Sequence, residues 1–146
     1  FIYFISIIFH LKVMAVSIDF YGPCDSKAFY QKTFKLTSAT SVGEATIAIL
    51  DMAKIPYLGT KECIVSINHS AHGMEALEIV NDQEMRSYGW CYALNDQSPD
   101  ELAHLVKLEN ENDRITWWYG YATFKNGEWS DYCQPAYKIK PTLFCQ

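Results

Sequence analysis

The feature that most limits what this chain can fold into is a change of hydrophobic period at residue 41. Residues 14–21 alternate between two faces, which is the period of a half-buried strand. The apolar positions of residues 41–56 instead recur at helical spacing. Ser41 and Glu44 form a capping box at the start of this segment, and Pro56 marks its end. One amphipathic helix therefore follows the first part of the chain.

Strands are predicted on both sides of this helix. Gly22-Pro23 turns the first strand into a second, antiparallel strand over residues 27–37. Residues 71–88 are less regular, and their EALEIV segment is compatible with a strand or a short helix. Asn126-Gly127 is typical of a β-hairpin turn. Beyond the helix, strands are predicted over residues 63–68, 89–96 and 111–124.

This order of elements predicts an α+β fold: a β-grasp-like mixed sheet crossed on one face by the main amphipathic helix. A short second helix is predicted through Val106, because Ser98-Pro99-Asp100-Glu101 combines a cap, a proline at the first helical position and a capping glutamate. Residues 14–125 would form this domain. Residues 126–146 would form an irregular C-terminal extension.

The composition fits one domain and argues against two classes of partner. The chain has 146 residues, of which 49% are hydrophobic, so it can form a single core. Its formal net charge is −5 and its lysines and arginines are scattered. A nucleic-acid binder or a binder of anionic membranes would normally show a dense basic patch. We therefore expect no nucleic acid and no membrane as partners of the mature chain.

The N-terminal segment differs from the rest of the chain. Residues 1–9 are almost entirely apolar, a stretch too short for a transmembrane helix but of the right length for the core of a signal peptide. Val13-Met14-Ala15 would lie near the cleavage point. Residues 1–15 thus predict a signal peptide, clipped at its basic start, and a secreted, periplasmic or cell-surface protein. A first β-strand and a translation start at Met14 are the alternatives.

The five cysteines argue against a structural metal site, because no CxxC pair and no zinc-finger spacing occurs. In an exported chain they allow up to two disulfides and leave one thiol. Cys63 and Cys91 would equally fit as small buried hydrophobic residues. Cys133 and Cys145 lie in the tail, where a disulfide would help to hold a segment with little core. The odd number leaves the pairing open.

The side chains suited to catalysis form no recognisable motif. His69 and His72 flank Ser70 in a predicted loop, and Cys63 or Cys91 could supply a nucleophile for a small Cys/His hydrolase. No carboxylate near the histidines completes a metal site. We expect no catalytic residue and no metal ligand, and keep the hydrolase as an alternative.

The aromatic residues of two predicted strands are the strongest candidates for binding, because Trp and Tyr concentrate in binding hot spots. Neighbouring side chains of a strand point to opposite faces, so Trp117 and Tyr119 would share one face and Trp118 would lie on the other. Which of the two tryptophans is core stays open. The predicted ligand-binding residues are Trp90, Tyr92, Trp117, Trp118 and Tyr119.

Two strands and their spacing carry a family resemblance. A G-W-x-Y-x-x-N strand is followed by a spacer, an acidic turn and a D-x-I-x-W-x-Y strand. Over about residues 14–122 the chain resembles the C-terminal domain of transcobalamin and intrinsic factor and its bacterial relatives, small secreted or surface domains of unknown function. The motif residues are Gly89, Trp90, Tyr92, Asn95, Asp113, Ile115, Trp117 and Tyr119.

The resemblance implies a β-grasp-like fold, export and recognition of a corrinoid. In the animal carriers cobalamin lies between this domain and a large helical barrel, and these 146 residues contain no such barrel. Asn95-Asp96 also replaces the usual Asn-Gly, and the tail beyond Tyr121 extends past the family pattern. Cobalamin is therefore the one cofactor considered, as a minority alternative.

The function expected from the sequence is that of an exported, non-catalytic binding module. It would engage a protein partner or a small ligand through an aromatic surface. Corrinoid binding and the Cys/His hydrolase are the alternatives, and a bacterial secreted factor acting on host proteins is also compatible with the sequence.

Overall fold

The computed structural model describes residues 13–38 and 41–146. Within these ranges the chain forms eight strands, one α-helix and two short 3-10 helices. The helices are α1 (Val42–Ala53), η1 (Gly73–Ala76) and η2 (Ala136–Lys138). The strands are β1 (Met14–Tyr21), β2 (Tyr30–Leu36), β3 (Tyr57–Gly59), β4 (Ile64–Ile67), β5 (Leu77–Asn81), β6 (Glu84–Leu94), β7 (Arg114–Lys125) and β8 (Glu128–Pro135).

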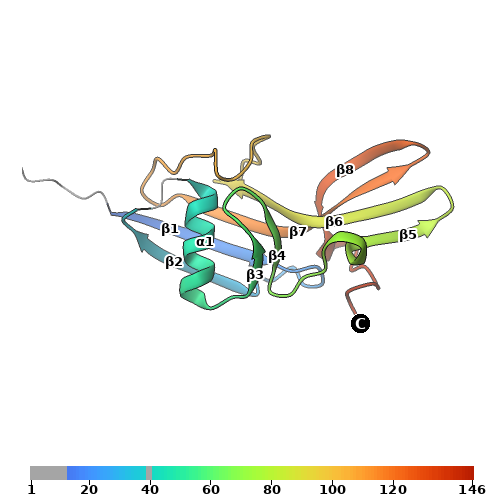
Figure 1. Cartoon of the computed structure of the whole chain (residues 1–146), viewed down its shortest axis with the longest axis horizontal. Coiled ribbons are helices and arrows are strands. Elements are labelled where there is room, and N and C mark those ends of the chain that lie inside the picture. Colours follow the sequence, from blue (N-terminus) through green and yellow to red (C-terminus); the bar gives the residue numbers. More distant parts are fainter. Residues whose placement is uncertain (1–12, 39–40) are drawn as a thin grey trace, which may run out of the picture.

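The main sheet has the strand order β2-β1-β7-β6-β5, and β8 also pairs with β7. β1 and β7 run parallel, whereas the other neighbouring strands are antiparallel. One edge of β7 binds β1 over residues 114–118 and β8 over residues 120–125. The β5–β6 and β7–β8 hairpins extend beyond the part of the sheet that α1 crosses (Figure 1). The predicted α+β fold with a mixed sheet is confirmed.

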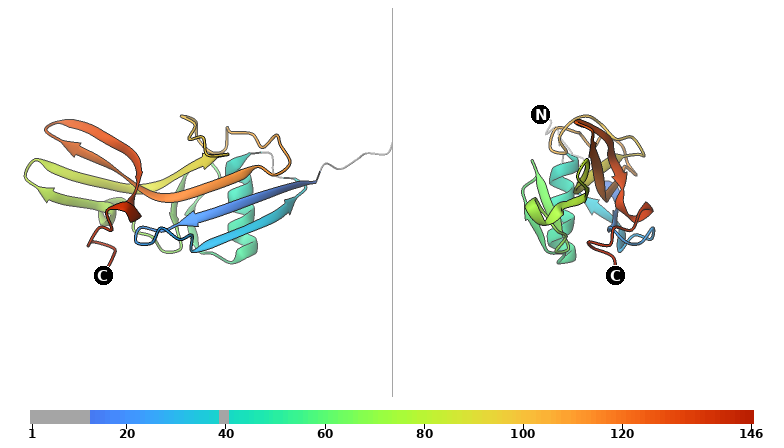
Figure 2. Two further views of the ribbon diagram at one scale, coloured as in Figure 1. Left: turned by 180° about the vertical axis from the view of Figure 1, so that it is seen from behind. Right: turned by 90° about the vertical axis from the view of Figure 1, so that its right-hand side faces the viewer.

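The core lies between α1 and one face of the sheet. Seen from behind, β1 and β2 lie in front of the helix (Figure 2). Ser41 caps α1 by accepting a hydrogen bond from the Glu44 amide, as the capping box predicts. Burial of each large aliphatic side chain here contributes roughly 2 kcal/mol. Fully buried core residues include Val16, Ile18, Phe20, Val42, Ile49, Leu50 and Ile115.

Trp117 belongs to this core, and Trp118 does not. The Trp117 side chain is only 4% exposed, and its Nε1 donates to Thr46 Oγ1 on α1 at 2.9 Å. Trp118 lies half-buried on the opposite face, where its Nε1 donates to the Cys133 carbonyl at 2.8 Å. The predicted alternation of the two rings is confirmed.

The short second helix expected through Val106 does not form. The chain between β6 and β7 is a series of turns, because its carbonyls are needed elsewhere. Ala103 and Val106 accept hydrogen bonds from the amides of Gly43 and Val42, at 2.9 Å each. These amides belong to the first turn of α1, where backbone N–H groups have no acceptor within the helix. The local helix signal is therefore overridden by the need to satisfy the start of α1.

Asp113 holds this long loop closed at the start of β7. Its carboxylate is 1% exposed and accepts hydrogen bonds from Asn95 Nδ2 and from the amides of Glu109 and Asn110. Asn95 Oδ1 in turn accepts from the Arg114 amide at 2.9 Å. Burial by itself would raise the pKa of Asp113, but the hydrogen bonds from Asn95, Asn110 and Glu109 outweigh it and lower the pKa.

Replacing Asp113 with asparagine is expected to lower the free energy of unfolding by about 3 kcal/mol, because an amide has one acceptor oxygen for three donors. In the wild type, the stabilisation from this lowered pKa is complete above pH about 4 and is lost as the pH falls further. Urea unfolding of both proteins between pH 2 and 7 would measure this. Asp82→Asn, at an exposed turn, is the control. An equal loss in Asp82→Asn, or none in Asp113→Asn, would contradict the role given to Asp113.

The C-terminal segment is more regular than expected. The predicted hairpin turn forms at Asn126 and Gly127, which have φ angles of 52° and 86°. The residues after it pair with β7 as β8, so the irregular extension expected over residues 126–146 is wrong for this part. β8 was not recognised because its residues are almost all exposed and show no apolar alternation.

Two disulfides fix the tail, Cys24–Cys145 and Cys91–Cys133, and Cys63 is an exposed free thiol. Two bridges and one remaining thiol agree with the sequence-based expectation, and the bridges fit a non-cytoplasmic protein. The signal peptide was expected over residues 1–15, of which residues 1–12 lie outside the described residues. Its last two residues, Met14 and Ala15, are the first two residues of β1. In the part of the chain that the structure describes, no helix is long and apolar enough to cross a membrane.

Candidate functional site

A pocket of about 370 Å³ lies beside the core, on the same sheet face as α1 but in a part of it that the helix does not cover. Distant parts of the chain meet there: the turn after β1, the loop between β4 and η1, the middle of β6 and β7, and the C-terminal tail. We call it the aromatic pocket. Its aromatic and polar lining residues are Phe29, Asn68, His69, Ser70, Glu75, Trp90, Tyr119 and Phe144.

Trp90 forms one wall of the aromatic pocket from β6. The half-buried indole donates from Nε1 to Ser70 Oγ at 2.7 Å. Its ring meets those of Phe29 and Tyr119 edge to face, with centroids 6.4 and 5.7 Å away. Such pairs add to the stability gained from burial alone. The indole is therefore held in a defined orientation before any ligand enters.

Tyr119 lies behind this wall as part of the pocket floor. It pairs directly with Trp90 across the β6–β7 ladder and is fully buried. Its hydroxyl donates to the Ala71 carbonyl at 2.7 Å, and its ring stacks on Tyr88 at 6.0 Å. Burial raises the pKa of the Tyr119 phenol, so it stays protonated and keeps this hydrogen bond.

The loop after β4 supplies the polar side of the pocket. Ser70 Oγ accepts from the Ile67 amide at 3.2 Å as well as from Trp90, and the Ser70 carbonyl accepts from Ser66 Oγ at 2.7 Å. Asn68 and His69 have left-handed backbones, with φ angles of 53° and 59°, which makes the turn tight. Ser70 thus ties the loop to both β4 and β6.

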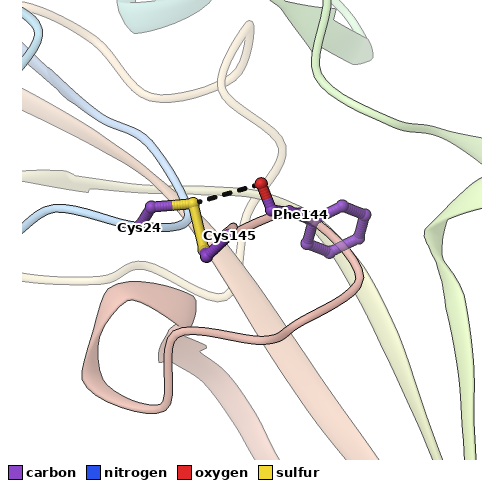
Figure 3. Close-up of a disulfide and its surroundings, with 3 residues drawn as sticks. All are labelled: Cys24, Phe144 and Cys145. Carbon is purple, nitrogen blue, oxygen red and sulfur yellow. Dashed lines mark hydrogen bonds between the residues drawn. A yellow bond between two sulfur atoms is a disulfide. The ribbon is translucent and has the colours of Figure 1, made fainter.

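The C-terminal tail closes the other side of the pocket through the Cys24–Cys145 disulfide (Figure 3). The neighbouring Phe144 ring packs edge to face on Tyr88 and Tyr119, at centroid distances of 4.9 and 5.5 Å. Cys24 Sγ lies 3.5 Å from the Phe144 carbonyl oxygen. A disulfide sulfur has no hydrogen to donate, so this is a packing contact. The covalent link joins the turn after β1 to the residue that follows Phe144.

The rim of the pocket carries one formal charge. Among the described residues that line it, Glu75 is acidic and none is lysine or arginine. A second hollow of about 310 Å³ adjoins it and shares His69, Ser70 and Glu75. His72 and Tyr57 belong to that second hollow. The polar edge between the two hollows is therefore acidic rather than basic.

The five aromatic residues predicted to bind are divided by the structure. Trp90 and Tyr119 line the aromatic pocket. Tyr92 stacks on Trp117 at 5.2 Å, and its hydroxyl donates to the Glu101 carbonyl, so both rings belong to the helix-covered part of the sheet. Trp118 lies on the other face beside Cys133. These five residues therefore do not form one surface.

The cysteine–histidine arrangement proposed for a hydrolase is not assembled. Cys91 is in a disulfide and has no thiol to act as a nucleophile. Cys63 precedes β4, whereas His69 and His72 follow it, so the strand lies between Cys63 and both histidines. Within residues 13–38 and 41–146, no three His, Cys, Asp or Glu side chains form a cluster that could hold a metal ion.

Several pocket residues could not be recognised in the sequence. Phe29 and Phe144 are separated by most of the chain, and only the fold and the Cys24–Cys145 bridge bring them together. Ser70 lies in the loop after β4 and Glu75 in η1, and neither belongs to a recognisable ligand-binding motif. The Cys145 position next to Phe144 was the one available signal, because a disulfide in the tail must fix the residues beside it.

Comparison with known proteins gives a family but no activity. The family described as "Domain of unknown function (DUF4430)" matches residues 44–121. No curated protein matches the chain at a significant level. A crystal structure described as "a putative metal binding protein from Ruminococcus gnavus ATCC 29149" is 11% identical, covers 73% of this chain and 98% of its own, and has a TM-score of 0.40. That similarity is too distant to bear on function.

Proposed function

Since the chain belongs to the DUF4430 family, a family of domains of unknown function, we propose that it is an exported, non-catalytic binding module whose binding site is the aromatic pocket. The observation that carries this proposal is the way in which the pocket is built. Separate segments and a disulfide hold aromatic walls around about 370 Å³, within the size range of small-molecule sites.

The walls are fixed in advance, which favours binding. The Trp90 indole and the Tyr119 hydroxyl already donate to Ser70 and Ala71. A ligand would therefore not have to order these side chains, and the entropy lost on binding would be small. The volume suits a small ligand or a single side chain of a protein partner. The two disulfides support maturation outside the cytoplasm.

The kinship with the transcobalamin C-terminal domain is also a proposal. Its support is that the two motif strands pair directly: Trp90 lies opposite Tyr119, and Tyr92 opposite Trp117. Asn95 then bonds to Asp113 and closes the loop between the strands. Cobalamin therefore belongs among the ligands to be tested.

A fragment library and cyanocobalamin should be screened against the protein by thermal shift, with the visible spectrum of cobalamin recorded in parallel. Compounds that bind in the aromatic pocket are expected to lose at least tenfold in affinity in Trp90→Phe, which is about 1.4 kcal/mol of binding free energy. Trp129→Phe, on β8 and outside the pocket lining, is the matched control and should bind as the wild type does. Compounds that bind Trp90→Phe and wild type equally would place the site elsewhere.

A further inference from the structure

We infer that the aromatic pocket takes an alkylated ammonium cation, of the quaternary type found in choline. This inference rests on the proposed function and names the class of ligand. Three features of the pocket point to it: its rings, the state of its hydrogen-bonding groups, and the sign of its charge.

The accessible rings leave an aromatic surface for a cation to contact. Phe29 is 41% exposed, and Trp90 and Phe144 are half-buried, so all three reach the pocket, and Tyr119 backs them. The face of an aromatic ring is electrically negative and attracts a cation within about 6 Å, most strongly when the ring is that of Trp. An alkylammonium group also brings apolar methyl groups, which match the apolar walls.

On the inner wall, the hydrogen-bonding groups of Trp90, Tyr119 and the Ser70–Ala71 segment are already paired, and the exposed side chains of Asn68, His69 and Glu75 line the rim. Ser70 Oγ receives the donors of Trp90 and Ile67, the Ala71 carbonyl receives Tyr119, and the Ser70 carbonyl receives Ser66. A primary ammonium has three N–H groups that need acceptors once they leave water. A quaternary ammonium has none. The pocket interior therefore suits a fully alkylated nitrogen better than a primary amine.

The charge of the rim has the sign that a cation requires. Glu75 is the one formally charged residue among those described in the pocket lining, since His69 is counted as neutral at pH 7. An anion would meet this carboxylate without a lysine or arginine to offset it. The adjoining hollow shares Glu75 and adds no basic residue other than His72. The net charge of −5 means that the chain as a whole also attracts cations rather than anions.

The test compares choline with 3,3-dimethylbutan-1-ol, which has the same shape but carries carbon in place of the charged nitrogen. Each is titrated into the full chain and followed by tryptophan fluorescence and by two-dimensional NMR. Choline is expected to bind at least tenfold more tightly than the neutral alcohol, and more tightly than ethanolamine. Glu75→Gln should weaken choline binding about fivefold and leave the alcohol unaffected. Phe29→Leu should weaken choline binding as well.

Glu128→Gln is the matched control, because it makes the same change of charge at an exposed residue of β8 outside the pocket lining. It should bind choline as the wild type does. Equal binding of choline and the alcohol would overturn the inference and leave the proposed function standing. No choline binding at millimolar concentration would also overturn it, and the fragment screen would then decide about the pocket. Choline binding that survives both Glu75→Gln and Phe29→Leu would place the cation elsewhere and overturn it too.

Discussion

Replacing Trp117 with alanine is expected to lower the free energy of unfolding by about 4 kcal/mol, which corresponds to a fall in melting temperature on the order of 12 °C. The indole lies in the core between β7 and α1, and its removal leaves a cavity there. Thr46 Oγ1 also loses the donor that it accepts from, although its own hydrogen bond to the Val42 carbonyl remains. Thermal and urea unfolding followed by circular dichroism would measure the loss.

Trp118→Ala is the natural control, because it removes the same side chain one residue further along the same strand. This indole is half-buried on the opposite face and has one hydrogen bond, to the Cys133 carbonyl. We expect it to contribute about 1 kcal/mol. Equal losses in the two variants would show that the sheet is packed on both faces to the same degree, contrary to the burial seen here.

Removing the Cys24–Cys145 disulfide is expected to produce the second large effect. The bridge joins residues 121 positions apart, and closing so long a loop stabilises a folded chain by about 4 kcal/mol. The double variant Cys24→Ser/Cys145→Ser should therefore melt on the order of 12 °C below the wild type. Its tail should also become more open to trypsin at Lys138, because Phe144 is no longer held against Tyr88.

Cys63→Ser is the control for this variant, since it replaces an exposed free thiol. A surface change of this kind alters stability by less than about 0.5 kcal/mol. A double variant that melts with the wild type and keeps its tail protected would mean that ring packing alone holds the C-terminus. Mass spectrometry of the intact wild type, with and without reduction, should show two disulfides.

The local parts of the fold could be predicted from the sequence. β1 and α1 have clear hydrophobic periods, and Asn126-Gly127 forms the turn that its residues favour. The missing helix near Val106 shows the limit of such rules. The Val106 carbonyl accepts a hydrogen bond from the first turn of α1, which is far away in the sequence. β8 was not predicted for a related reason: it is held by backbone pairing with β7, which requires no apolar alternation in its side chains.

The candidate site could be predicted only in part. Trp90 and Tyr119 were found because they stand in strands with recognisable periods. These two rings line a pocket, whereas Trp117 is buried, because α1 covers only part of the sheet. The position of Phe144 in the pocket depends on which cysteine forms the disulfide with Cys145. Five cysteines allow many pairings, and only the three-dimensional arrangement selects one.

The parallel pairing of β1 with β7 has a consequence for the order of assembly. Ser17 pairs with Arg114 and Tyr21 with Trp118, so the partner of β1 is made only late in synthesis. Until then β1 can pair only with β2, and its other edge has unpaired backbone groups. Contacts between such distant segments slow folding, because a long loop must close before they form. The β5–β6 and β7–β8 hairpins, each joined by a tight turn, are the local units that can form first. The docking of β1 onto β7 is the step at which the N- and C-terminal halves become one domain.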